Sequence, residues 1–102
     1  MNLYINTKDR KQVVVRLTND HQTISELSEV NEYGSQALLP LITKLLSNSG
    51  LKWQDLKGIE VEVGPGSFTG LRVGATVAQT LGFALDIPVN GVKNYSIELS
   101  YQ

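Results

Sequence analysis

The chain has 102 residues and a mass of 11.2 kDa, which is the size of one domain. Hydrophobic residues make up 41% and charged residues 19%, a balance typical of globular proteins and not of disordered chains. The net charge is −1, whereas a protein that binds nucleic acid by itself normally carries a basic excess. The lack of cysteine excludes disulfides, zinc–thiolate sites and thiol nucleophiles.

The sequence also indicates where the protein is found. The first fifteen residues lack the apolar core of a signal peptide, and no window approaches the ~20 apolar residues of a membrane span. A chain without cysteine is compatible with a reducing compartment. We therefore expect a cytoplasmic protein that does not associate with membranes.

The N-terminal third alternates with the two-residue period of β-strands. Strands are expected at residues 3–5 and 13–17 and, less regularly, at 22–30. Polar turns at residues 8–11 and 19–21 separate them. Three strands joined by short turns predict an antiparallel meander.

Two helices are expected further along the chain. The first spans residues 35–48, with Ser35 as its cap, and Pro40 is expected to bend or loosen its first turns. The second spans residues 69–85 and ends sharply because Pro88 follows.

Further short elements complete the predicted order. A strand at 59–63 separates the two helices, a short strand at 89–92 follows the second, and another helix starts at Asn94 or Ser96. The order β-β-β-α-β-α-β predicts a single α/β domain with a mixed sheet covered by helices. The second helix would then join a parallel pair of strands in a right-handed crossover.

Both predicted helices have apolar arcs of about 200°, which exceed the stripe that a sheet normally covers. Small residues also recur every four positions in the second helix, where each interior glycine costs about 1 kcal/mol relative to alanine, so a close backbone contact is expected. Mutual packing of the helices or an external helical partner would cover the excess, and we favour the partner. The predicted interface residues are Leu38, Leu41, Ile42, Leu45, Gly70, Val73, Gly74, Val77, Ala78 and Leu81.

A glycine-rich corner precedes the second helix. Backbone N–H groups at a strand–turn–helix corner can hold an anion, and the helix dipole would help. The stretch matches neither the dinucleotide fingerprint nor the P-loop, whose final glycine is followed by lysine. Its glycines equally suit a structural turn, the interpretation that we favour. The corner consists of Gly64, Pro65, Gly66, Ser67, Phe68, Thr69, Gly70, Leu71 and Arg72, and continues to Gly74.

Patterns typical of catalysis or metal binding are not found in the sequence. His21 is the only histidine and lies in a predicted turn. The acidic residues are not paired at spacings that suggest acid–base or metal chemistry, and Ser67 and Thr69 have no identifiable base. We therefore expect no enzyme, no metal and no resident cofactor.

The stretch GPGSFTGLRVG at residues 64–74 resembles the most recognisable motif of the TsaB family, also called YeaZ. Support extends through residues 38–42, 50–51, 55–56, 87–89 and 91–92. The resemblance implies one ASKHA (actin-like, RNase H-like) domain over residues 1–102, the first lobe of the family, with the second lobe absent. Such proteins bind nucleotide between two lobes, so one lobe is not expected to close around ATP. The family commonly has an aspartate after the first strand, where this chain has Asn6-Thr7-Lys8.

The resemblance further implies a non-catalytic scaffold in the synthesis of threonylcarbamoyladenosine on tRNA. Such a scaffold docks its catalytic partner TsaD through its first two helices, TsaE joins the larger complex, and only the complex engages tRNA. Two alternatives remain open. The glycine-rich corner would make the chain a small nucleotide- or phosphate-binding lobe, or the helical face would pair with its own copy in a homodimer.

Overall fold

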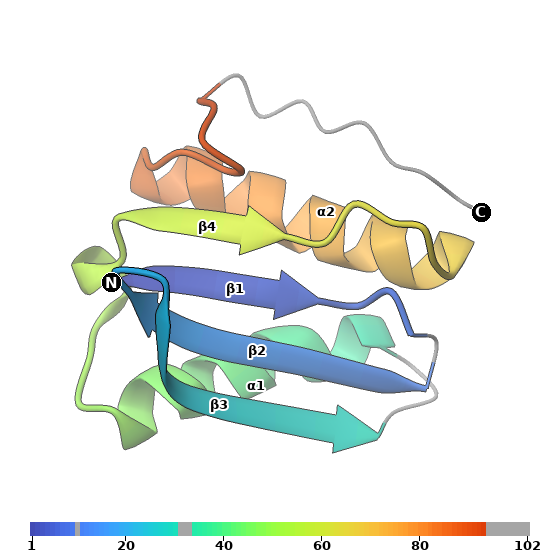
Figure 1. Ribbon diagram of the computed structural model, residues 1–102, viewed down its shortest axis with the longest axis horizontal. Helices are drawn as coiled ribbons and strands as arrows, with labels where there is room; N and C mark the ends of the chain where they lie inside the picture. Colours follow the sequence, from blue (N-terminus) through green and yellow to red (C-terminus); the bar gives the residue numbers. More distant parts are fainter. Residues whose placement is uncertain (10, 31–33, 94–102) are drawn as a thin grey trace.

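A four-stranded mixed sheet organises the protein, whose computed structural model describes residues 1–9, 11–30 and 34–93. The strands lie in the order β3-β2-β1-β4 (Figure 1). β1, β2 and β3 form the predicted antiparallel meander, and β4 pairs with β1 in parallel. The strands are β1 (Asn2–Asn6), β2 (Gln12–Asn19), β3 (Gln22–Val30) and β4 (Gly58–Val61).

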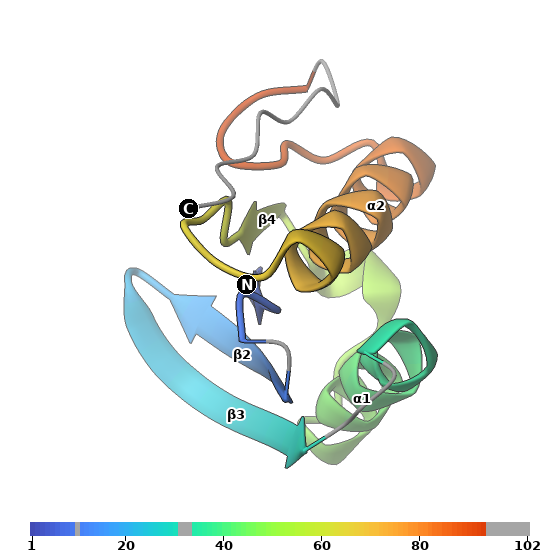
Figure 2. The same ribbon diagram turned by 90° about the vertical axis from the view of Figure 1, so that its right-hand side faces the viewer.

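Two helices, α1 (Gly34–Asn48) and α2 (Phe68–Leu85), cover one face of this sheet (Figure 2). A short 3₁₀ turn, η1 (Trp53–Asp55), precedes β4. α1 begins at Gly34, so Ser35 lies inside its first turn and not before it as predicted. Pro40 lies inside the continuous helix, on its exposed side.

The predicted strand at 89–92 is shorter in the structure. Val89 forms a parallel bridge with Ile59 and an antiparallel bridge with Val92. The bridge between Val89 and Ile59 covers the outer edge of β4. There the N–H of Ile59 donates to the carbonyl of Pro88 at 2.9 Å. The helix predicted to start at Asn94 or Ser96 lies outside the described residues.

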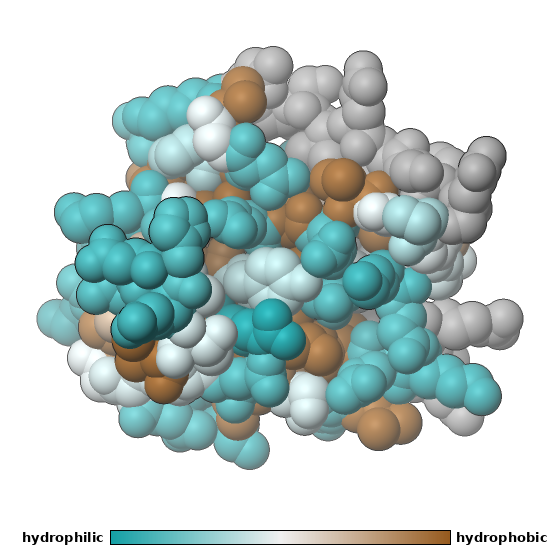
Figure 3. All heavy atoms as spheres, viewed as in Figure 1, coloured by the Kyte–Doolittle hydropathy of each residue, from teal (hydrophilic) through white to brown (hydrophobic). Residues whose placement is uncertain are grey.

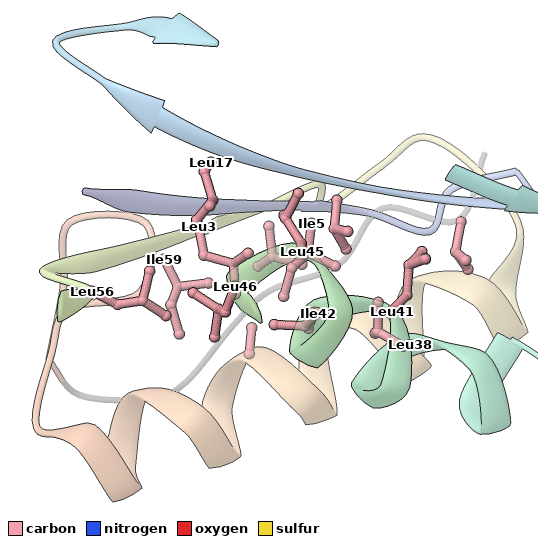
Figure 4. Packing of buried hydrophobic residues seen from close by; sticks show 14 of the residues in the cluster. Leu3, Ile5, Leu17, Leu38, Leu41, Ile42, Leu45, Leu46, Leu56 and Ile59 are labelled. Carbon is pink, nitrogen blue, oxygen red and sulfur yellow. The ribbon is translucent and has the colours of Figure 1, made fainter. Parts of the chain in front are cut away.

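Alternation along the strands produces the core, because every second side chain of a strand faces the helices. Leu3 is opposite Leu17 on β2 and Ile59 on β4. These side chains lie in the layer between the sheet and the two helices (Figure 4). The buried cluster includes Leu3, Ile5, Val13, Val15, Leu17, Leu38, Leu41, Ile42, Leu45, Leu46, Leu56, Ile59, Val61, Ala78, Ile87 and Val89.

The opposite face of the sheet carries a polar network. The Tyr4 hydroxyl donates to Glu62 at 2.7 Å, and the Arg16 guanidinium lies 4.9 Å from the centre of the Tyr4 ring while pairing with Glu26. Burial and then the bond to Glu62 raise the pKa of Tyr4 to about 12. Figure 3 views the molecule from this side and shows mainly hydrophilic residues with smaller apolar patches.

Candidate docking site

The glycine-rich corner packs against the segment that follows β1. Ser67 caps α2 by accepting from the Gly70 N–H at 3.3 Å, and its own N–H donates to the Lys8 carbonyl at 2.9 Å. A Cβ at Gly66 would lie 2.6 Å from Cβ of Lys8. The Ser67 and Gly70 N–H groups therefore already have acceptors within the chain, and they do not fit a phosphate group.

Two of the small residues that recur every four positions in α2, Gly70 and Gly74, also pack against another segment of this chain. A Cβ at Gly70 would lie 2.1 Å from the Thr7 carbonyl oxygen, and one at Gly74 would lie 2.3 Å from the Thr7 hydroxyl. Thr7 is only 1% exposed and donates to the Gly70 carbonyl at 2.6 Å. The predicted close backbone contact exists, but Thr7, just after β1 of this chain, makes it. Gly74 is therefore buried by packing within this chain.

The apolar side of α1 faces the core, so the side chains predicted to dock from that side are not accessible to a partner. The sheet on one side and α2 on the other cover the wide apolar arc, and Leu39, 45% exposed, is the large apolar residue of α1 that remains outside. Ala78 of α2 is buried as well. The predicted interface residues that are corrected in this way are Leu38, Leu41, Ile42 and Leu45 on α1, with Gly74 and Ala78 on α2.

An apolar groove remains on the outer side of α2. Val73, Val77 and Leu81 are only partly buried and pack at the margin of the core. The groove has a volume of about 400 Å³. Its lining residues recur with helical periodicity on one side of α2 and are Phe68, Thr69, Arg72, Val73, Thr76 and Val77. The predicted excess of apolar surface therefore exists on α2 and not on α1.

Arg72 places a positive charge at this groove. Its guanidinium lies 5.4 Å from the centre of the Phe68 ring, within the range of a cation–π contact. The ion pairs among the described residues are Arg16–Glu26 and Lys93–Asp86, and neither involves Arg72.

The sequence did not predict that Thr69 and Thr76 line the groove, since both are polar. Their positions could have shown it, because Thr69 lies four residues before Val73 and Thr76 three residues after it. They border the apolar strip and stay exposed.

The acidic side chains have structural partners in several places. Asp9 accepts from the Lys11 N–H at 2.9 Å, Asp55 accepts from the Lys52 N–H at 2.8 Å, and Asp86 pairs with Lys93. His21 is exposed in the turn between β2 and β3. Within residues 1–9, 11–30 and 34–93, no group of three His, Cys, Asp or Glu could hold a metal ion. None of the helices in these ranges is long and apolar enough to span a membrane.

Comparison with known proteins decides the family. A family model described as "TsaD: tRNA N6-adenosine threonylcarbamoyltransferase" matches residues 28–98, which is more than half of the chain. The chain is 41% identical over 73 residues to tRNA threonylcarbamoyladenosine biosynthesis protein TsaB of Haemophilus influenzae, covering 68% of this chain and 31% of that protein. It is 34% identical over 92 residues to TsaB of Bacillus subtilis, covering 90% of this chain and 40% of that protein. The chain belongs to this family, among its TsaB (YeaZ) members.

A solved structure agrees with this assignment. YeaZ from Pseudomonas aeruginosa superposes with a TM-score of 0.79 and 33% identity, covering 86% of this chain and 42% of that one. The fold is therefore of the ASKHA type, as predicted. The chain spans less than half the length of these TsaB and YeaZ relatives. The family domain also occurs in a Nitrosospira multiformis protein named tRNA N6-adenosine threonylcarbamoyltransferase, which is 37% identical over 83 residues, covering 71% of this chain and 24% of that protein.

Proposed function

We propose that this chain acts in tRNA threonylcarbamoyladenosine biosynthesis as a non-catalytic lobe that docks TsaD through the outer side of α2. The observation that carries this proposal is the apolar groove on α2, which residues 1–9, 11–30 and 34–93 leave uncovered. A groove lined by Val73 and Val77 on one helix suits the apolar side of a second helix. Of the interface predicted from sequence, the proposal keeps Gly70, Val73, Val77 and Leu81.

The family names support the pathway, because relatives in Haemophilus influenzae and Bacillus subtilis carry threonylcarbamoyladenosine biosynthesis in their names. The non-catalytic role is supported by the acidic residues, since Asp9, Asp55 and Glu62 serve turns and the sheet surface. TsaE would join the TsaD complex, and tRNA would be engaged by that complex in the cytoplasm. A transferase assay on the isolated chain tests this part, and turnover without TsaD would contradict it.

Docking is tested by filling the groove. Thr76 is exposed and lines the groove, so Thr76→Trp should block a partner helix without disturbing the core. The matched control is Thr23→Trp on β3, an exposed threonine of the sheet. Purified wild-type chain and the Thr23 variant should co-elute with TsaD from the same organism, whereas the Thr76 variant should elute alone.

Circular dichroism of all three proteins verifies that each is folded. Co-elution of the Thr76 variant with TsaD would contradict docking through this groove. Loss of co-elution in both variants would contradict a contact confined to the groove, because the control changes a different surface.

A further inference from the structure

The two helices give their side of the molecule an unusual charge. Arg72 is the only charged residue among the 18 of α2, and Lys44 is the only one among the 15 of α1. Neither helix contains a carboxylate. Because the whole chain has a net charge of −1, the residues outside these helices carry −3. The helix layer is therefore positive on a protein that is otherwise negative.

The charge of Arg72 is held at the groove. Its guanidinium lies over the Phe68 ring, and both side chains line the groove beside Val73. Arginine stacked on an aromatic ring keeps its planar N–H donors available for a carboxylate, which it can bind through two parallel hydrogen bonds. The groove thus combines an apolar strip with one fixed positive charge.

We propose that this groove selects a partner helix that carries an aspartate or glutamate beside its apolar stripe, and that Arg72 binds that carboxylate. The proposal rests on the docking function proposed above and adds the chemistry of the partner surface. Apolar side chains at helical spacing would fill the strip at Val73 and Val77, and the carboxylate would meet Arg72. Complementary charge would also orient the approaching partner toward the helix layer.

The same charges disfavour a second copy of this chain as the occupant. Two-fold pairing through α2 would bring together two helix layers that each contain Arg72 and Lys44 and no carboxylate. Like charges at such an interface oppose association. A homodimer through this groove that does not bind TsaD is therefore an outcome that would overturn the proposal.

The test measures the affinity of the 102-residue chain for TsaD from the same organism. Charge reversal by Arg72→Glu should weaken binding by about tenfold or more in low salt, and Arg72→Lys should weaken it less because a lysine lacks the planar fork. The matched control is Lys57→Glu, which makes the same charge change at an exposed residue just before β4. This control should bind like wild type. The difference between Arg72→Glu and wild type should shrink at about 0.5 M NaCl, where exposed charges are screened.

Three results would separate the two proposals. If Arg72→Glu binds TsaD like wild type while Thr76→Trp does not bind, docking through the groove stands and the role of Arg72 is refuted. If both variants bind like wild type, docking through this groove is refuted, and the role of Arg72 with it. If light scattering shows a wild-type dimer that Thr76→Trp dissolves, and TsaD does not bind, the occupant is a second copy and the acidic partner is refuted.

Discussion

The hydroxyl of Thr7 donates a 2.6 Å hydrogen bond to the carbonyl oxygen of Gly70, joining two residues that lie 63 positions apart in the chain. This bond ties the end of β1 to the first turns of α2. The two glycines nearby require small size for different reasons. A Cβ at Gly70 would meet the backbone oxygen of Thr7, whereas one at Gly74 would meet its side-chain hydroxyl.

The first prediction uses this difference. Gly74→Ala should lower the free energy of unfolding by about 1–3 kcal/mol, because the added methyl group overlaps the Thr7 hydroxyl. Combined with Thr7→Ala, the same change should be nearly neutral, since the next contacts of that methyl group are Cγ2 of Val61 at 3.4 Å and Cβ of residue 7 at 3.5 Å. Urea unfolding of both single variants and the double variant measures the coupling.

Gly70→Ala is the matched control for that cycle. It should remain destabilising in the Thr7→Ala background, because the backbone oxygen that it meets is still present. If Gly74→Ala lowers the free energy of unfolding equally with and without the Thr7 hydroxyl, another group must exclude a side chain at position 74.

The second prediction concerns Asn90, whose side chain completes the edge of the sheet. Its Oδ1 accepts from the Val61 N–H at 2.8 Å, and its Nδ2 donates to the Val61 carbonyl at 3.2 Å. Asn90 has a φ of 50°, so Asn90→Gly keeps the backbone conformation and removes only the side-chain bonds. The variant should lose about 1–3 kcal/mol of stability, and the Val61 amide should exchange hydrogen faster.

Asp86→Gly provides the control for this change. Asp86 also has a positive φ, of 55°, and its side chain makes an exposed ion pair with Lys93. Exposed pairs contribute about 0–1 kcal/mol, so this variant should have nearly wild-type stability. If both glycine variants lose the same stability, the backbone and not the Asn90 amide is responsible.

Local patterns in the sequence predicted the elements well. α2 begins one residue before its predicted start and ends where predicted, because Ser67 supplies the cap and Pro88 follows closely. The strands follow from alternation, which reports the two faces of a sheet directly. The weakest strand prediction, β3, is an edge strand with mostly exposed side chains, so its alternation is less regular.

The candidate site could be predicted only in part, since it depends on which neighbours cover each helix. The apolar arcs of α1 and α2 are similar in the sequence. In the structure, the sheet and α2 bury the arc of α1, whereas Val73 and Val77 of α2 stay half-buried. No local pattern connects Thr7 to Gly70, or Asn90 to Val61, because those pairs lie 63 and 29 residues apart. The chain's own contacts therefore accounted for glycines that the sequence assigned to an external partner.

The third prediction is a pH effect at Tyr4. Burial is the main cause that raises the pKa of Tyr4 to about 12 from its ordinary value of 10.0, and the bond to Glu62 contributes. Between pH 10 and 12, the native state therefore keeps the Tyr4 proton while the unfolded chain has lost it. Stability from this group is therefore fully present below pH 10 and is lost as the pH rises through 12. Tyr4→Phe should remove this dependence.

Spectroscopic titration of the tyrosines checks this assignment. One phenol of the native protein should ionise late, and Tyr4→Phe should abolish that late step. Glu62→Gln should lower the pKa of Tyr4 only part of the way, because burial remains. A late step that persists in Tyr4→Phe would assign the raised pKa to another tyrosine.

The fourth prediction separates the core of α1 from the groove of α2. Ile42 is fully buried, so Ile42→Val should lower the free energy of unfolding by about 0.5–1.5 kcal/mol while leaving the affinity for TsaD unchanged. Thr76→Trp should leave the free energy of unfolding nearly unchanged and weaken TsaD binding, since it changes an exposed groove residue and no core contact. Thermal unfolding and a TsaD binding isotherm on each variant measure both quantities. A weaker isotherm for folded Ile42→Val would contradict this separation, because the core beneath α1 would then influence docking.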